Sequence, residues 1–249
     1  MNDFNRGYAR SIPADRADMS VDAGLRSFML GVYNKVALGL LLSGALAFLT
    51  SATPLANLLY QVGPGGRFAG FTLLGMVVAF APLVMMLVSM FAMRNPTARS
   101  SGILYWAMVA SIGAGLGVWL LIYTGASVAA TFFVTAAAFG GLSLVGYTTK
   151  KDLTGFGSFL IMGLIGIMLA SLVQMFLHLP GLSFVINILG VFIFAGLIAY
   201  DTQRLKMTYY ALGGDQQSMA VATNYGALSL YLNFINLFQF LLSMMGDRR

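Results

Sequence analysis

The chain has 249 residues, of which 59% are hydrophobic and only 9% are charged, and its formal net charge is +6. A soluble core of this length needs a polar surface that this composition does not supply, so the sequence predicts an integral membrane protein. The absence of Cys and Glu excludes disulfides, thiolate chemistry and sites built on glutamates. The basic residues are scattered through short loops instead of forming one patch, which argues against binding to nucleic acid.

Residues 1–27 are polar and contain no long apolar stretch, so we expect a mobile cytoplasmic tail that is neither a signal peptide nor a span. Seven apolar runs follow, and each has the roughly 20 residues that a helix needs to cross a hydrocarbon core of about 30 Å. They cover residues 28–50, 70–92, 102–123, 125–147, 156–178, 182–203 and 226–245. Because backbone groups in lipid must be hydrogen-bonded within the segment, we expect an all-α bundle of seven transmembrane helices.

The distribution of Lys and Arg predicts how the bundle is oriented. Most of these residues fall in the tail and in every second loop, at Arg6, Arg10, Arg16, Arg26, Arg94, Arg99, Lys150, Lys151, Arg204 and Lys206. The opposite side has only Arg67, Arg248 and Arg249. The positive-inside rule therefore places the N-terminus in the cytoplasm and, after seven spans, the C-terminus outside. If the last run is a re-entrant hairpin, the C-terminus returns to the cytoplasm.

Asp201 is the only acidic residue in any strongly apolar run, at the end of the 182–203 segment. An ionisable group in a membrane helix is costly and is retained mainly where it faces a protein interior or a hydrated cavity, so Asp201 is the first candidate for a functional residue. The alternative is an interfacial side chain that is hydrated and only orients the chain.

The 226–245 run differs from the others because polar residues recur along one helical face. Ser229, Asn233, Asn236 and Ser243 follow helical spacing, and Gln239 lies beside them. Lipid would not tolerate this stripe, so we expect the last helix to run inside the bundle. The stripe either lines a hydrated path or joins neighbouring helices by hydrogen bonds, each worth about 0.6–2 kcal/mol.

Four stretches resemble the Bax inhibitor-1 family, in its bacterial branch. They are VYNKVALGL at residues 32–40, YTTKKDLT at 147–154, AYDTQ at 199–203 and ALSLYLNFINLF at 227–238. The resemblance implies a seven-helix fold with the C-terminal helix at the centre, and a cation leak that is usually described for calcium and is sensitive to pH. It also implies localisation in the bacterial inner membrane and a role in stress response and membrane protein quality control.

The family's pH sensor is described as two facing aspartates, joined in the closed state by an arginine near the cytoplasmic end of the second span. Asp201 matches the first aspartate, and Arg94, just after the 70–92 run, is the match for the arginine. Asn233 stands at the position of the second aspartate. Two close carboxylates share one proton, whereas an amide donates a hydrogen bond to an ionised carboxylate. We therefore expect weaker pH gating in this chain.

The sequence lacks the catalytic residues that the known classes of intramembrane protease require. An intramembrane aspartyl protease needs a second aspartate, and a serine protease needs a paired histidine, while His178 lies at the opposite membrane face from Asp201. We expect no enzyme, no cofactor and no tightly bound metal, because one Asp with amides cannot supply the oxygen ligands of a tight calcium site. Two hypotheses remain: a leak for cations such as Ca²⁺, or a non-conducting regulator of a stress response or of a membrane-anchored protease.

Overall fold

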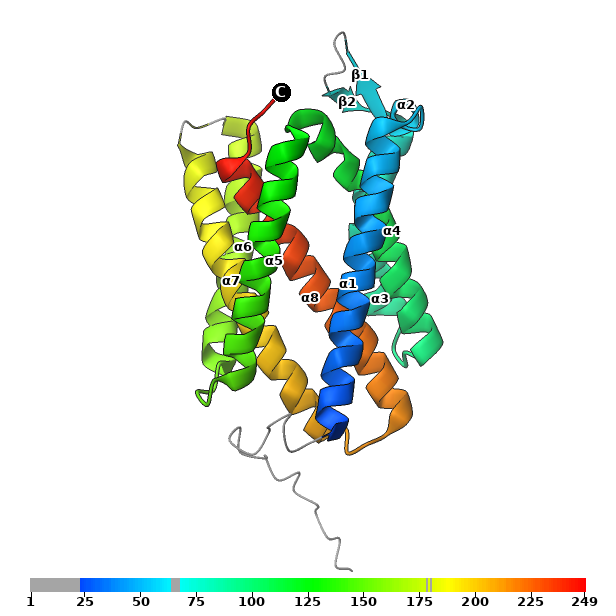
Figure 1. The fold of residues 1–249 in the computed structure, drawn as a ribbon, viewed down its shortest axis with the longest axis vertical. Helices are drawn as coiled ribbons and strands as arrows, with labels where there is room; N and C mark the ends of the chain where they lie inside the picture. The colour runs from blue at the N-terminus through cyan, green and yellow to red at the C-terminus, as the bar shows by residue number, and fades with distance from the viewer. Residues whose placement is uncertain (1–22, 64–67, 178, 180) are drawn as a thin grey trace, which may run out of the picture.

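The structure is a computed structural model that describes residues 23–63, 68–177, 179 and 181–249 (Figure 1). Residues 1–22 of the predicted tail, Arg67 and His178 lie outside the described residues. Residues 23–27, which were assigned to the tail, are helical, because Leu25 is buried against the bundle and extends the first helix.

Seven of the helices are long and apolar enough to cross a membrane, which confirms the predicted all-α fold class. They are α1 (Ala23–Ala52), α3 (Leu73–Ala92), α4 (Ala98–Ile122), α5 (Gly125–Thr148), α6 (Thr154–Leu177), α7 (Leu182–Ala211) and α8 (Gln216–Met245). Their outward faces are rich in exposed Leu, Phe, Met and Val, as expected for surfaces in contact with lipid.

The long helices form two groups with α8 between them. Helices α1, α3 and α4 lie on one side and α5, α6 and α7 on the other, while α8 crosses diagonally and packs against α1, α4, α5 and α7 (Figure 1). Helix α8 also has the largest buried share of the seven. The C-terminal helix is therefore central, as predicted, and it is one continuous helix instead of a re-entrant hairpin.

The two ends of the bundle differ in their connections. The α3–α4, α5–α6 and α7–α8 connections share one end with the start of α1, and we call it the basic end because it carries Arg94, Arg99, Lys150 and Lys151. The opposite end holds a β-hairpin, the α4–α5 turn and the C-terminus, and we call it the hairpin end.

The segment between the predicted runs 28–50 and 70–92, together with the start of the second run, forms a short helix and a β-hairpin. A short helix, α2 (Ala56–Leu59), precedes strands β1 (Tyr60–Val62) and β2 (Phe68–Phe71), which pair antiparallel. Tyr60 is buried, and its hydroxyl donates to the carbonyl of Ala114 at 2.6 Å, which fixes the hairpin over α4. Helix α3 therefore begins only at Leu73, where the Thr72 side chain caps it.

The region 204–225, which lies between the predicted runs 182–203 and 226–245, is mostly helix. Helix α7 continues to Ala211 and α8 begins at Gln216, because residues such as Leu205 and Asn224 are buried between the two helices and their neighbours. The turn that joins them contains Gly213 and Gly214 with φ angles of 58° and 89°, which side chains disfavour. The 226–245 run was therefore only the apolar part of a longer helix.

Helices α1 and α4 approach each other closely where α4 carries glycine. A methyl group placed on Gly113 would lie 2.6 Å from Cα of Ser43 on α1, so any side chain there would push the helices apart. Helix α3 contains Pro82, which lacks the N–H that would bond the carbonyl of Val78. Ser111 of α4 donates to that carbonyl at 2.9 Å and satisfies it across the interface.

Candidate functional site

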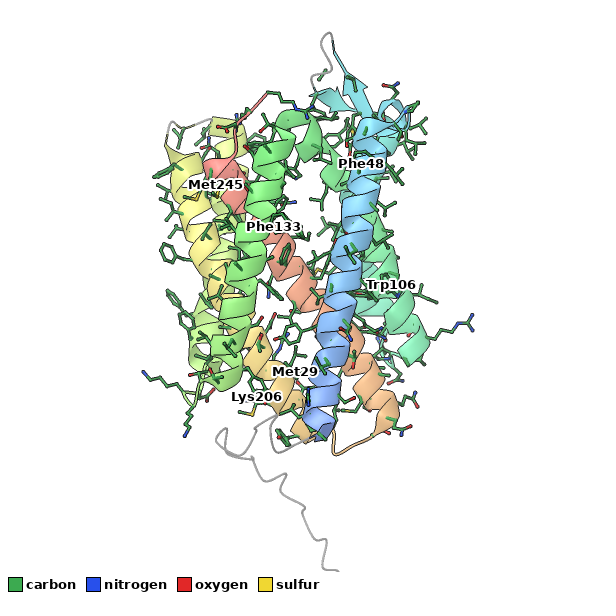
Figure 2. The ribbon with its side chains drawn as sticks, in the orientation of Figure 1. Met29, Phe48, Trp106, Phe133, Lys206 and Met245 are labelled. Carbon is green, nitrogen blue, oxygen red and sulfur yellow. The ribbon has the colours of Figure 1, made fainter. Side chains whose placement is uncertain are left out.

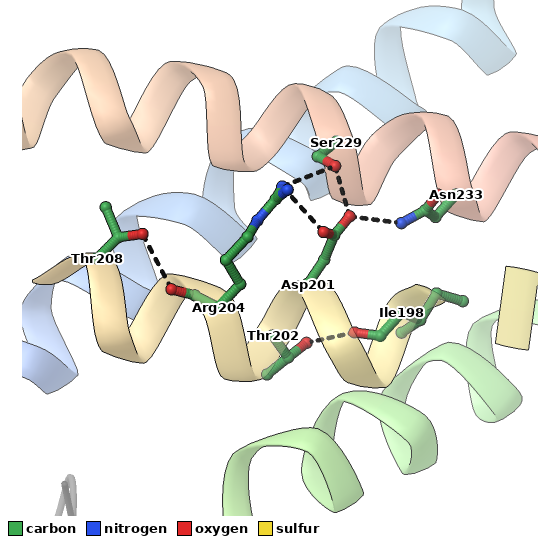
Figure 3. A network of polar contacts seen from close by, with 7 residues as sticks. All are labelled: Ile198, Asp201, Thr202, Arg204, Thr208, Ser229 and Asn233. Carbon is green, nitrogen blue, oxygen red and sulfur yellow. Dashed lines mark hydrogen bonds and ion pairs between the residues drawn. The ribbon is translucent and has the colours of Figure 1, made fainter. Parts of the chain in front are cut away.

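Asp201 lies near the basic end of α7, on the face that packs against α8 (Figure 3). Its exposure is only 5%, so the carboxylate lies inside the protein instead of in the surrounding solvent. The interfacial alternative, in which Asp201 is a hydrated cap, does not fit this burial. A buried carboxylate must be paired or hydrogen-bonded, which directs attention to its partners.

Three side chains donate to the Asp201 carboxylate. Ser229 and Asn233 of α8 both donate to Oδ2, at 2.5 and 2.8 Å, and Arg204 of α7 pairs with Oδ1 at 2.9 Å (Figure 3). The guanidinium of Arg204 also reaches the Ser229 hydroxyl at 3.4 Å. The contacts join α7 to the central helix, and the pairing of Asp201 with Asn233 that the family resemblance implied is present.

Arg94 does not lie beside Asp201 in this structure, as its predicted role would require. Arg94 is exposed in the connection between α3 and α4, and the arginine that pairs with Asp201 is Arg204. Arg204 sits three residues after Asp201 on the same helix, so the two side chains share a face without any long-range constraint. That spacing was visible in the sequence, where Arg204 was used only to assign orientation.

The polar stripe of α8 divides into parts with different roles. Ser229 and Asn233 contact α7, whereas Asn236 and Ser243 donate to carbonyls of their own helix, those of Leu232 and Gln239. Each residue turns an α-helix by about 100°, so Gln239, six residues after Asn233, points about 120° away from it around the helix axis. Gln239 lines a cavity of about 190 Å³ between α3, α4 and α8, together with Pro82 and Ser111.

A second polar cluster joins α1, α4 and α8 near the basic end. The Lys35 ammonium donates to Oδ1 of Asn224, and the Asn224 amide donates to the Ser101 hydroxyl at 2.8 Å and to the Ala98 carbonyl at 3.0 Å. Asn224 is buried, so the Lys35 ammonium binds a partner inside the bundle. Sequence reasoning missed Asn224 because this residue precedes the predicted 226–245 run.

Gln203, another residue that sequence reasoning missed, holds the α5–α6 connection against α7. Its amide donates to the carbonyl of Lys151 and its carbonyl accepts from the N–H of Leu153, both at 2.8 Å. The neighbouring Lys206 is also buried, and its ammonium lies over the ring of Tyr147 and donates to the Tyr147 carbonyl. Helix α7 is thus tied to α5 and α8 within two turns around Asp201.

Asp201 lines none of three cavities that the bundle contains. These are an apolar cavity between α1, α4, α5 and α8, the cavity beside Gln239, and a pocket beside Tyr33 and Tyr147. Within the part of the chain that is described, no group of three or more His, Cys, Asp or Glu side chains could hold a metal ion. The acid is therefore enclosed by its donors.

Fold and site together define a polytopic α-helical membrane protein with a buried acid joined to a central C-terminal helix. The family model described as inhibitor of apoptosis-promoting Bax1 matches residues 25–249. The chain therefore belongs to the Bax inhibitor-1 family, as its sequence motifs indicated.

Three relatives, all bacterial proteins, are similar to this chain over nearly its full length. A protein of Caulobacter vibrioides is 73% identical over the full length of both chains. RP147 of Rickettsia prowazekii is 40% identical, over 97% of this chain and 98% of its own. The inner membrane protein YbhL of Escherichia coli is also 40% identical, over 91% of this chain and 94% of its own.

Proposed function

We propose that this protein is a cation leak of the bacterial inner membrane, with Asp201 as the acidic residue at the inner mouth of its path. The observation that carries the proposal is the burial of Asp201 against the central helix, where Ser229 and Asn233 hold it. A carboxylate buried in a membrane helix is costly even when it is paired, and such residues mark ion paths, proton relays or internal water paths. The proposal assigns no catalytic step to the chain.

The enclosed arrangement corresponds to a closed state. Opening requires α7 and α8 to separate near the basic end, so that the carboxylate exchanges its protein donors for a hydrated cation. With one acid, the site supports weak and transient passage of Ca²⁺ instead of tight binding, because tight calcium sites use six to eight oxygen ligands. By the positive-inside rule, the basic end faces the cytoplasm and the C-terminus lies outside.

We also propose that gating near neutral pH is weak in this chain. The ionisable group that contacts Asp201 among the described residues is Arg204, and the α8 partner is the neutral amide of Asn233. In Asn233→Asp two carboxylates would meet at this contact, and such a pair retains one proton to a higher pH than a single acid does. Proton loss near neutral pH would then separate the helices by charge repulsion.

The test is calcium flux into liposomes that contain the purified protein and an enclosed calcium dye. The wild type should leak calcium and Asp201→Ala should not, while Asp152→Ala, which removes an exposed carboxylate at the same end of the bundle, should behave as the wild type. Between pH 6 and 8 the wild-type flux should change little, and Asn233→Asp should make it steeply dependent on pH.

Two outcomes would contradict these proposals separately. A steep pH dependence in the wild type that Asn233→Asp leaves unaltered would refute the gating proposal and retain the leak. Absence of flux at every pH, together with a co-purifying membrane protease, would refute the leak and favour the non-conducting regulator.

A further inference from the structure

An apolar cavity of about 510 Å³ opens between α1 and α5 in the half of the bundle nearer the hairpin end. We call it the lateral cavity. Its walls come from α1, α4 and α5, and its floor is the central helix α8. Its lining is almost entirely apolar and includes Leu41, Ser43, Gly44, Phe48, Trp119 and Phe133.

The lining offers almost nothing to which water could bind. Its polar side-chain groups are the indole N–H of Trp119 and the hydroxyl of Ser43, which already bonds the hydroxyl of Tyr231 at 2.7 Å and the carbonyl of Val109 at 3.3 Å. A buried water needs two to four polar partners, and apolar cavities of smaller volume stay dry and accept apolar ligands. The natural occupant is therefore a hydrocarbon.

The mouth of the lateral cavity is continuous with the lipid-facing surface. Leu41 and Phe48 of α1 are 71% and 62% exposed, and Phe133 of α5 is 71% exposed. Figure 2 shows Phe48 and Phe133 on the two sides of the gap between α1 and α5, with α8 behind it. Bilayer hydrocarbon thus has direct access to the cavity, and no part of the described chain covers the mouth.

We propose that the lateral cavity binds one acyl chain of a bilayer phospholipid, which enters between α1 and α5 and rests on α8. The volume lies within the range of about 300–1,000 Å³ that is usual for small-ligand pockets. Because no charged side chain lines the cavity, the headgroup stays at the membrane surface of the hairpin end. The lipid chain fills space between the two helix groups and contacts the helix that also holds Asp201.

The two Trp residues of the chain make this proposal measurable, because Trp119 lines the cavity and Trp106 does not. In a Trp106→Phe background the fluorescence of Trp119 is followed in bilayers of phosphatidylcholine brominated along its acyl chains. Gly44→Leu is added to fill the cavity, since no atom lies within 4 Å of a methyl group placed there. Gly166→Leu is the control, on the exposed face of α6 and equally free of neighbours.

Bromine should quench Trp119 strongly in the background protein and in the Gly166→Leu control. In Gly44→Leu the quenching should fall by about half, because the leucine displaces the chain from contact with the indole. Equal quenching in all three proteins would overturn the proposal and leave only ordinary contact with surrounding lipid. Weak quenching in all three proteins would also overturn the proposal. If the protein is then found to be a dimer that shields Trp119 from lipid, the cavity is the binding surface for a second copy of the chain.

Discussion

Asp201 is a buried acid, and the one charged partner that it has among the described residues, Arg204, is half-exposed. The side chain of Arg204 is 49% exposed while that of Asp201 is 6% exposed, so water screens the guanidinium more than the carboxylate. The two neutral donors on α8 therefore matter for keeping the carboxylate in place. A buried charge that loses a donor is left with an uncompensated cost of desolvation.

The role of Arg204 is tested by Arg204→Gln. We expect the variant to unfold more readily than the wild type, by about 1 kcal/mol, because Asp201 loses its ion pair but keeps Ser229 and Asn233. Arg94→Gln is the matched control, since Arg94 is exposed in a connection. Thermal unfolding of the purified proteins in detergent measures both. A larger effect from Arg94→Gln would restore Arg94 as the partner of the acid.

At the scale of the element, helix ends are set by local chemistry that the sequence displays. Thr72, Thr97, Thr124 and Asp215 each accept a hydrogen bond from a backbone N–H in the first turn of the helix that follows. Such caps satisfy groups that would otherwise lack partners, so helices begin at these positions. Composition windows missed this signal, which is why the starts of α3 and α8 were misplaced.

Asp215, which caps α8, gives a prediction about pH. The hydrogen bonds from Ser218 lower the pKa of Asp215, so the cap stabilises the fold above the ordinary aspartate pKa and loses this effect as pH falls through the lowered value. Asp215→Ala should melt at a lower temperature than the wild type at pH 7, and the difference should narrow below about pH 4. Melting curves from pH 3 to 7 measure it. A difference that is constant with pH would show that the carboxylate charge has no part in the cap.

The close approach of α1 and α4 gives a prediction about packing. Gly113→Ala should destabilise the protein by about 1–3 kcal/mol, because the new methyl group meets the α1 backbone at Ser43. Gly115→Ala, two residues along the same helix and with no atom within 4 Å, should be neutral or stabilising by about 0.5–1 kcal/mol. Thermal unfolding separates the two, and equal effects would contradict the assigned contact.

For the whole molecule, the seven spans and the central position of α8 could be predicted because both follow from how polar and apolar residues are distributed along the chain. The Asp201–Asn233 contact was predicted from family resemblance, since residues distant in sequence leave no local signal of their proximity. The arginine is a different case, because Arg204 lies three residues after Asp201 on α7 and this spacing is visible in the sequence. The family motif instead directed the prediction to Arg94, which is distant from Asp201 in sequence.

The two-group architecture places α8 between helices that otherwise make limited contact. Helix α8 packs on members of both groups, so a change in its position would alter its contacts with both groups of helices. Asp201 with its α8 partners lies near the basic end, and the lateral cavity lies nearer the hairpin end. One helix thus connects the proposed ion site with the proposed lipid site.

The orientation of the whole bundle is open to direct measurement because the chain has no Cys. Single cysteines can replace Val62 and Arg249 at the hairpin end and Asn95 at the basic end, and all three positions are exposed. The positive-inside rule predicts that a membrane-impermeant maleimide labels Val62→Cys and Arg249→Cys in intact spheroplasts. Asn95→Cys should be labelled only after the membrane is permeabilised. The reverse pattern would place the basic end outside, and Asp201 would then lie at the outer mouth of any ion path.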